Sequence, residues 1–420
     1  MKRGIAVEEA KALIAAALPA PRAQRLALRR ALARVLAADL SAAEDLPAFA
    51  TSAMDGYAVR AAEVAGACAA APRLLPLAGE IAAGAARAVP WPPGSVLRIM
   101  TGAPVPPGCD GVVPVELTEE TPAGVRLRAD LDATGSNLRP AGGDVRAGAP
   151  LLAAGSRLGP AALALLAAQG LAQVPVWRLP RVSFLATGDE LVALDERPGP
   201  GQIRNSNGPA ALALLAESGF PARDLGVAPD DPATLRRLLG EALAGSDVLI
   251  TSGGVSMGRY DAVATLLVEL GAEWVFHGVR QQPGKPLAFL QWRGRPVFGL
   301  PGNPVSTFVT LWFYVLPALR RMAGHPRPEP ASVTAALAAP LHGRPDRQVF
   351  ARARVEWTAG GWLATPRPPH GSHLLSSLAA ANAFAIVPSG IGELPAGAAV
   401  RTAWLGPPPD WVGEGAMGQG

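Results

Sequence analysis

The sequence predicts a multidomain protein in which a mainly parallel α/β domain is combined with β-rich regions. From Arg181 to about Met322, short apolar runs alternate with helical patterns, and such βα units are typical of a parallel sheet with helices on both faces. Residues 60–145 and 326–404 instead contain short apolar runs between Gly and Pro clusters, as β-rich regions do. A chain of 420 residues is also too long for one compact core.

The N-terminal region is predicted to be helical and then extended. Residues 7–18 and 24–37 are rich in Ala and Leu with Arg on the other faces, a pattern that predicts two helices. Residues 41–59 contain Pro and Gly and predict a long linker, and residues 158–170 return to a helical pattern.

The α/β region is predicted to alternate regularly, and Asp231 followed by Pro232 is typical of a helix cap with proline at the first helical position. The predicted strands are 182–186, 225–228, 248–250, 274–277, 287–290 and 297–300. The predicted helices are 207–218, 232–244, 262–270 and 305–321. The C-terminal strands are predicted at 349–355, 362–365, 383–387 and 398–404, before a disordered tail.

Composition excludes several classes of function. The net charge is +4 and the basic residues are scattered without interleaved aromatics, so we expect no nucleic-acid partner but small anionic ligands. Cys68 and Cys109 lack partners at metal spacing, which argues against a structural zinc or a disulfide framework. No signal-peptide core and no 18-residue uncharged apolar run occurs, so we expect a cytoplasmic protein without a membrane span.

Three Gly-rich loops follow predicted strands of the α/β region: ATGDEL (186–191), TSGGVSMG (251–258) and LPGNPVS (300–306). Ligands of open α/β sheets bind beyond the carboxyl ends of the strands, where these loops meet. Glycine lets successive N–H groups form an anion-binding nest, although a plain strand-to-helix turn is the alternative for each loop alone. Pro304 is expected to leave the N–H groups of Val305 and Ser306 directed outward, as a helix-terminus anion site. The loops together predict a phosphate or oxyanion site.

Carboxylates at the same edge predict a metal ion. Glu190, Asp230 and Asp261 lie at or near strand ends, and spaced carboxylates beside a phosphate site suit Mg²⁺. For single residues the alternatives are competition of Asp230 with Asp231 for the helix cap, and a favourable acid near a helix N-terminus at Asp261. Dinucleotide, P-loop and nucleophile-elbow motifs are absent from the sequence.

With these residues assembled, the chain resembles the MoeA family of molybdopterin molybdenumtransferases, which also includes the gephyrin E domain. The resemblance extends from about Val7 to Trp404. It is carried, in the family's order, by SAMDGYAV (52–59), RIMTGAPVPPGCDGVVPVE (98–116), ATGDEL, GQIRNSN (201–207), TSGGVSMGRYD (251–261), PGKP (283–286), LPGNPVSTFV (300–309) and GSHLLSS (371–377).

The resemblance implies molybdenum cofactor biosynthesis, in which molybdate is inserted into the dithiolene of adenylyl-molybdopterin with Mg²⁺-dependent release of AMP. It also implies a homodimer, and transient contact with the molybdopterin adenylyltransferase and with molybdoenzyme chaperones. A tungstate-inserting paralogue remains an alternative, because the two oxyanions have nearly the same size and charge. A gephyrin-like scaffold is a further alternative, disfavoured because the matched acids and Lys285 are all present.

The implied fold has a MogA-like α/β domain at 179–325 and a C-terminal small β-barrel at 326–408. The other implied parts are a helical and extended linker region at 1–45 and 146–178, a β-rich inserted domain at 46–145, and a tail at 409–420.

Matched by position, the resemblance implies catalytic roles for Asp55, Thr101, Asp144, Glu190, Asp230, Asp261 and Lys285, with Glu190, Asp230 and Asp261 as metal ligands. From the loops and the resemblance together we expect substrate contacts from Thr187, Gly188, Asp189, Ser252, Gly253, Gly254, Ser256, Arg280, Gly284, Pro301, Gly302, Asn303, Pro304, Ser306, Arg352, Ser372 and His373.

Four positions depart from the family's usual residues. Gln282 stands where a lysine often precedes PGKP, and Gly278 occupies another frequently basic position. Gly143 stands where a glutamate often precedes Asp144, and Asn205 where an aspartate is frequent. Lys285 remains, with Arg280 as a substitute for the missing charge. Ser252, Gly253 and Gly254 are expected to hold phosphate oxygens, so the molybdate contact must come from other residues, and these departures leave open which ones.

Overall fold

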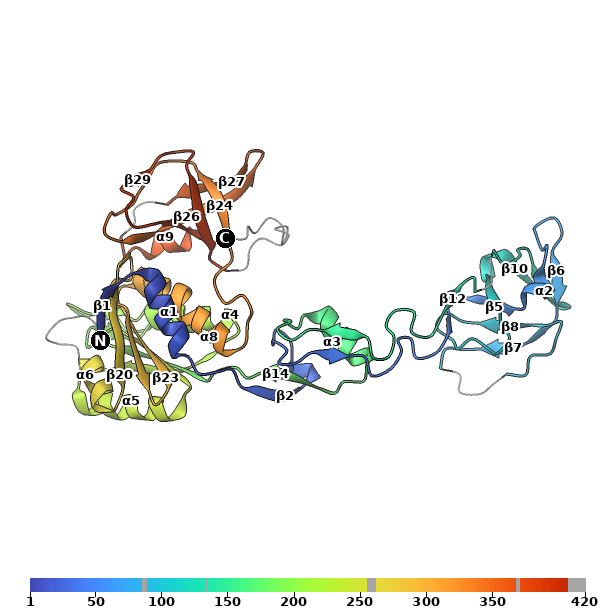
Figure 1. The fold of residues 1–420 in the computed structure, drawn as a ribbon, viewed down its shortest axis with the longest axis horizontal. Coiled ribbons are helices and arrows are strands. Elements are labelled where there is room, and N and C mark those ends of the chain that lie inside the picture. The colour runs from blue at the N-terminus through green and yellow to red at the C-terminus, as the bar shows by residue number, and fades with distance from the viewer. Residues whose placement is uncertain (85–88, 133–134, 255–261, 368–370, 407–420) are drawn as a thin grey trace. The chain divides into compact units, whose positions relative to one another are not determined.

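The computed structural model describes residues 1–84, 89–132, 135–254, 262–367 and 371–406 (Figure 1). The chain divides into two compact units, one formed by Met1–Gln24 and Val176–Gly420 and the other by Arg25–Pro175. It passes between them near β2 (Ala23–Ala27) and β14 (Gln173–Trp177). None of the helices in the described part of the chain combines the length and apolar character that a membrane span requires.

The larger unit is built on a seven-stranded sheet with the order β1-β20-β22-β23-β19-β15-β18. All neighbouring pairs are parallel except those of β22, which runs antiparallel to β20 and β23. Strands β15 and β19 are buried along their whole length, as strands covered on both faces are. The prediction of a mainly parallel sheet is confirmed. The strands are β1 (Lys2–Ile5), β15 (Val182–Thr187), β18 (Ala222–Ala228), β19 (Val248–Ser252), β20 (Glu273–Val279), β22 (Ala288–Trp292) and β23 (Arg295–Leu300).

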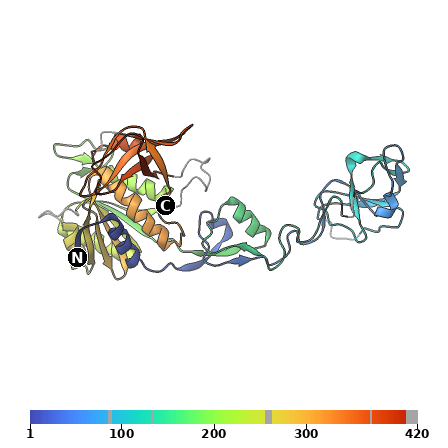
Figure 2. The same cartoon turned by 45° about the horizontal axis from the view of Figure 1, so that its top comes forward.

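Helices cover both faces of this sheet (Figures 1 and 2). Two of them, α5 (Pro232–Gly245) and α6 (Ala262–Glu269), bury leucines against one face. The other face packs on α1, α4 and a continuous helical segment in which a π-helical turn joins α7 to α8. These elements are α1 (Val7–Ala17), α4 (Asn207–Glu217), α7 (Pro304–Thr310), η3 (Leu311–Val315) and α8 (Leu316–Met322).

Local sequence explains where the helices near the sheet edge begin. The Asp231 carboxylate accepts a hydrogen bond from Thr234 N at 2.8 Å and caps α5, with Pro232 at its first position. Asn205 Oδ1 accepts from Gly208 N at 2.9 Å and so holds the first turn of α4. A short parallel pair, β16 (Leu191–Val192) and β17 (Ile203–Arg204), precedes α4.

The C-terminal part of the larger unit forms a closed five-stranded barrel, in the order β26-β27-β24-β30-β28 with β28 returning to β26. Strand β21 (Gln281–Gln282) adds to it in parallel with β26 and so joins the barrel to the α/β part. The barrel strands are β24 (Ser332–Leu337), β26 (Gln348–Thr358), β27 (Gly361–Pro366), β28 (Ala383–Val387) and β30 (Ala399–Trp404). The same region also contains the helix α9 (Leu375–Ala379) and a separate pair of short strands, β25 (Leu341–His342) and β29 (Glu393–Leu394).

The smaller unit is mainly β, as predicted, with a four-stranded sheet in the order β7-β8-β5-β9 and a three-stranded sheet in the order β10-β11-β6. Its strands are β3 (Leu40–Ser41), β4 (Thr51–Ser52), β5 (Gly56–Val59), β6 (Arg73–Leu75), β7 (Leu77–Ile81), β8 (Val96–Ile99), β9 (Gly111–Pro114), β10 (Thr118–Thr121), β11 (Gly124–Leu127), β12 (Leu138–Arg139) and β13 (Pro150–Leu152). Its helices are η1 (Leu28–Arg30), α2 (Ala61–Val64), η2 (Val115–Leu117) and α3 (Pro160–Ala168).

The predicted helix at 24–37 is wrong. This segment forms β2, the single turn η1 and irregular backbone. Ala33 and Leu36 donate their N–H groups to carbonyls of the 156–158 segment, at 2.8 and 3.0 Å. Ala and Leu favour a helix only weakly, and pairing with a distant segment outweighs that preference.

The predicted linker at 41–59 is also wrong in its second half, which contributes the buried strand β5 to the four-stranded sheet. Gly56, the glycine of the predicted linker, lies in this strand. A Cβ at Gly56 would lie 2.1 Å from Val113 O, so the close approach of β5 and β9 requires glycine.

Candidate active site

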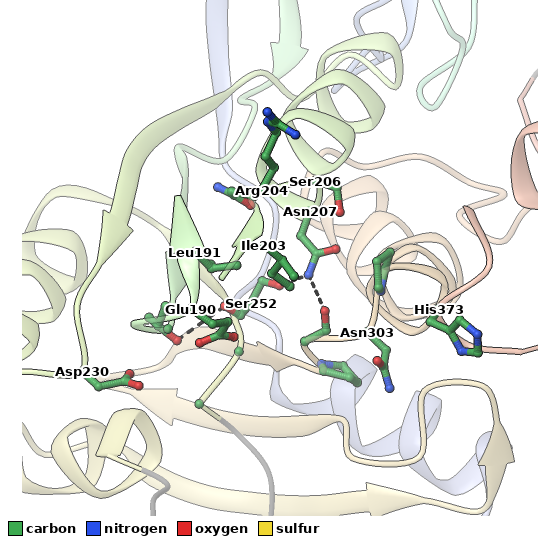
Figure 3. A pocket seen from close by; sticks show the side chains of 18 of the residues that line it. Glu190, Leu191, Ile203, Arg204, Ser206, Asn207, Asp230, Ser252, Asn303 and His373 are labelled. Carbon is green, nitrogen blue, oxygen red and sulfur yellow. Dashed lines mark hydrogen bonds between the residues drawn. The ribbon is translucent and has the colours of Figure 1, made fainter. Parts of the chain in front are cut away.

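A cavity of about 790 Å³ opens at the carboxyl ends of β15, β19 and β23, where the three Gly-rich loops were predicted to meet (Figure 3). The described part of all three loops contributes to its wall. The lining residues are Thr187, Gly188, Glu190, Leu191, Ile203, Arg204, Asn205, Ser206, Asn207, Asp230, Ser252, Gly253, Gly254, Pro286, Pro301, Gly302, Asn303, Pro304 and His373.

Close backbone packing explains the glycines of the second loop. Gly253 and Gly254 have φ values of 93° and 62°, which only glycine adopts readily. A Cβ at Gly253 would lie 2.4 Å from Thr187 O, so the loops after β15 and β19 touch through their main chains. The N–H of Gly253 donates to Leu300 O at 3.1 Å, so this group is used within the sheet.

Asn207 connects the second and third loops. Its Nδ2 donates to Ser252 Oγ at 2.9 Å and to Gly302 O at 2.7 Å (Figure 3). Its Oδ1 is buried and has no hydrogen-bond partner among the described residues. One amide at the start of α4 thus fixes the spacing of two loops of the cavity wall.

Two of the three predicted acids line the cavity. Glu190 follows β15 and Asp230 follows β18, and Asp189 Oδ1 accepts a hydrogen bond from Asp230 N at 2.9 Å. Because Asp231 caps α5, the capping alternative for Asp230 is wrong. Asp261 and Ser256 lie outside the described residues. Within the described part of the chain, no group of three His, Cys, Asp or Glu side chains is arranged to hold a metal ion.

The third loop departs from expectation at α7. The N–H of Val305, expected to face a ligand, donates to Ser372 O at 3.1 Å. Ser306 is buried and is not among the cavity-lining residues. The Thr307 hydroxyl donates to Pro301 O at 2.6 Å and so connects the third loop to α7. The start of α7 is therefore joined to the segment that bears His373.

Arg352 of the barrel is 1% exposed, and one of its Nη atoms donates to Gly371 O at 3.3 Å. Burial lowers the pKa of its guanidinium. The PGKP segment reaches the cavity through Pro286, whereas Lys285 and Arg280 are exposed. Gly284 has a φ of 91° and packs inside this turn.

Three predicted catalytic residues belong to the smaller unit. The N and Oγ1 atoms of Thr101 both donate to Asp55 Oδ1 at 2.7 Å. The side-chain bond and then the backbone bond from Thr101 lower the pKa of Asp55, with a further contribution from Arg98. Asp144 is exposed, and its N–H donates to Leu46 O at 3.0 Å. The structure thus brings Asp55 and Thr101 together within this unit.

One group of cavity residues was not predicted from the sequence. Leu191, Ile203, Arg204, Asn205, Ser206, Asn207 and Pro286 line the cavity and were not predicted as site residues. Five of them belong to the GQIRNSN motif, which carried the resemblance but contains no glycine nest or carboxylate. The signal that could have indicated them is the cluster of two amides, Asn205 and Asn207, and the guanidinium of Arg204 after β16.

Comparison with known proteins finds three family matches along the chain. Residues 5–170 match the MoeA N-terminal region (domain I and II), 183–321 a probable molybdopterin binding domain, and 334–403 the MoeA C-terminal region (domain IV). A Mycobacterium tuberculosis protein named molybdopterin molybdenumtransferase 2 is 37% identical over 396 residues, covering 93% of this chain and 97% of its own length. The Bacillus subtilis molybdopterin molybdenumtransferase is 36% identical, covering 90% and 88%.

Solved structures agree with these matches. Two crystal structures of the molybdopterin biosynthesis MoeA protein from Pyrococcus horikoshii have TM-scores of 0.79 and 0.76 to this chain. Their sequence identities are 31% and 28%, and both cover 96% of this chain.

Proposed function

Since the chain belongs to the MoeA family of molybdopterin molybdenumtransferases, transferases of molybdenum cofactor biosynthesis, we propose that it inserts molybdate into the dithiolene of adenylyl-molybdopterin and releases AMP. The observation that carries this proposal is the cavity at the carboxyl ends of β15, β19 and β23, which combines Gly-rich turns with two carboxylates. Such a wall suits a ligand that has both a pyrophosphate and a bound cation.

Glu190 and Asp230 fit a magnesium ion, because both present carboxylate oxygens to the same cavity, and Asp261 completes the proposed ligand set. Bound Mg²⁺ would neutralise charge on the pyrophosphate. Asp189 Oδ1 accepts a hydrogen bond from Asp230 N at 2.9 Å, and this bond orients one of the two carboxylates. We propose that the Ser252–Gly254 loop contacts the phosphate oxygens.

Molybdate is a tetrahedral dianion and requires cationic and hydrogen-bonding groups. We assign it to the exposed Lys285, next to the lining residue Pro286, with Arg280, Arg352 and Ser372 as further candidates. We further propose catalytic roles for Asp55, Thr101 and Asp144, on the basis of the resemblance. The bonds from Thr101 lower the pKa of Asp55 and so stabilise its carboxylate form. The homodimer, the cytoplasmic location and the contacts with the adenylyltransferase and chaperones remain proposals.

The experiment measures AMP release from adenylyl-molybdopterin with molybdate and Mg²⁺. We expect Glu190→Gln and Asp230→Asn to lower the rate by about 100-fold, the usual scale for the loss of one electrostatic contact in an active site. Asp231→Asn is the matched control. Asparagine also caps helices, and this variant leaves Asp230, the neighbouring residue that lines the cavity, unchanged. Unchanged rates in the first two variants would remove the proposed metal role. Replacing molybdate by tungstate in the same assay distinguishes the tungstate-inserting alternative.

A further inference from the structure

The turn that carries Lys285, residues 281–286, is fixed at both ends. It starts in β21, where Gln281 pairs with Gln348 of the barrel strand β26. It returns to the α/β sheet through two main-chain bonds, from Val279 N to Lys285 O and from Gly278 N to Leu287 O, both 2.8 Å. Since Pro286 lines the cavity, the position of this turn decides where the Lys285 side chain begins relative to the cavity.

The side chain of Gln281 fills the interior of the turn. It is 0% exposed, and its Nε2 donates to Pro283 O and Gly284 O, both at 3.1 Å. Pro283 and Gly284 are buried, so their carbonyls need internal donors. A Cβ at Gly284 would lie 2.5 Å from Gln281 Nε2, which shows how closely the turn packs on this amide.

Tyr314 determines which way the amide points. Its hydroxyl donates to Gln281 Oε1 from the π-helical turn η3. Burial raises the pKa of Tyr314 well above its usual value, and Glu8 and Glu329 raise it further, so the phenol is a donor at neutral pH. With the oxygen of the amide bonded to Tyr314, the NH₂ group must face the two turn carbonyls. The reverse orientation would place an oxygen against them.

We propose that Gln281 and Tyr314 are positioning residues that hold the turn carrying Lys285 at the cavity and thereby set the affinity for the oxyanion substrate. This inference rests on the proposed role of Lys285 in molybdate binding. Gln281 acts through the main chain of the turn, without touching the substrate. A π-helical turn within an α-helix is frequently associated with functional sites, and here it is the element that brings Tyr314 to the amide.

The test compares kcat and the KM values for molybdate and adenylyl-molybdopterin in Gln281→Met, Tyr314→Phe, Lys285→Ala and the Gln281→Met/Lys285→Ala double variant. We expect Gln281→Met to raise the KM for molybdate about tenfold, the scale of one displaced contact. Both kcat and the KM for adenylyl-molybdopterin should change less than about twofold, because only the position of Lys285 is altered. Tyr314→Phe should act in the same direction, and Gln281→Met should add nothing to Lys285→Ala.

The control is Gln291→Met, which removes a side-chain bond of 2.6 Å to Ala17 O outside the turn and should leave the KM for molybdate unchanged. If Lys285→Ala raises this KM but Gln281→Met and Tyr314→Phe do not, the positioning role is wrong and the proposed role of Lys285 stands. If Lys285→Ala leaves it unchanged, the role of Lys285 is wrong, and the inference fails with it. Additive effects in the double variant would also overturn the inference. Tyr314→Phe deletes a single oxygen atom and tests the same inference if Gln281→Met does not fold.

Discussion

Replacement of Asn207 by alanine tests whether the cavity wall is held together by one amide. Asn207 Nδ2 bonds to Ser252 Oγ at 2.9 Å and to Gly302 O at 2.7 Å, so the variant disconnects two loops at once. Nothing else in the two loops is altered. We expect a larger effect on ligand affinity than on the free energy of unfolding.

The magnitude follows from the two hydrogen bonds of the side chain and from its one oxygen atom, which is unpaired among the described residues. Two neutral hydrogen bonds contribute about 1–3 kcal/mol together, and their loss destabilises the folded protein by that amount. The Oδ1 atom, buried and without a partner among the described residues, costs about 1–3 kcal/mol and is removed by the same substitution. The two terms offset each other, so the free energy of unfolding should change by less than about 2 kcal/mol. The affinity for AMP with Mg²⁺ should fall about tenfold, because the loop proposed to contact the phosphate loses the hydrogen bond that fixes Ser252.

Calorimetric titration with AMP and Mg²⁺ measures the affinity, and urea denaturation measures the stability. Asn382→Ala is the matched control, because Asn382 also makes two side-chain bonds, to Val355 N at 2.7 Å and Val355 O at 2.9 Å. It should destabilise the protein by about 1–3 kcal/mol and leave AMP binding unchanged. Asn207→Asp keeps the shape, removes the donors and adds negative charge, so it should weaken binding further. Wild-type affinity in both Asn207 variants would refute the reasoning.

Two further predictions concern the smaller unit. Hydrogen bonds from Thr101 hold the pKa of Asp55 below its ordinary value, so the stabilisation from Asp55 is present above its unfolded-state pKa and is lost as the pH falls through the folded-state value. Thr101→Val should raise the pKa of Asp55 and flatten the acid side of the stability profile; a carboxylate NMR titration with an unshifted pKa would contradict this. Gly56→Ala should destabilise the unit by about 1–3 kcal/mol, since its Cβ would meet Val113 O at 2.1 Å. Gly159→Ala, with no atom within 4 Å of its Cβ, should cost less than about 0.5 kcal/mol, and equal urea midpoints for the two would argue against the close-approach explanation.

The α/β part of the fold could be predicted from the sequence because its signals are local. Without any tertiary information, the sequence indicates the apolar runs that form β15 and β19 and the Asp231–Pro232 cap. The segment 24–37 could not be predicted, because several of its N–H groups, including those of Ala33 and Leu36, are bonded to residues more than a hundred positions away. The π-helical turn η3 was likewise read as ordinary helix, since nothing in its apolar sequence distinguishes it.

The wall of the cavity was predictable to the extent that glycines and carboxylates form it. Glu190, Asp230 and the loops after β15, β19 and β23 meet as expected. Asn207 was not predicted, because an asparagine at the start of a helix is ordinarily assigned to the helix terminus, and its bonds to Ser252 and Gly302 form only in the folded protein. The N–H of Val305 was misjudged for the same reason, since Ser372 comes to it from the C-terminal part of the chain.

The charges on the cavity wall explain why a cation belongs to the proposed chemistry. Among the described lining residues, two carboxylates, Glu190 and Asp230, stand against one guanidinium, that of Arg204. Pyrophosphate and molybdate are both anions, and two carboxylates close to them would oppose binding unless positive charge lies between. In the proposed function, Mg²⁺ would supply that charge at the carboxylates and Lys285 would supply it at the molybdate. Gln282 and Gly278 occupy two positions where basic residues are frequent in the family, so this chain lacks two further positive charges near the turn. The position of Lys285, which we propose that Gln281 fixes, therefore matters more here than it would beside additional lysines.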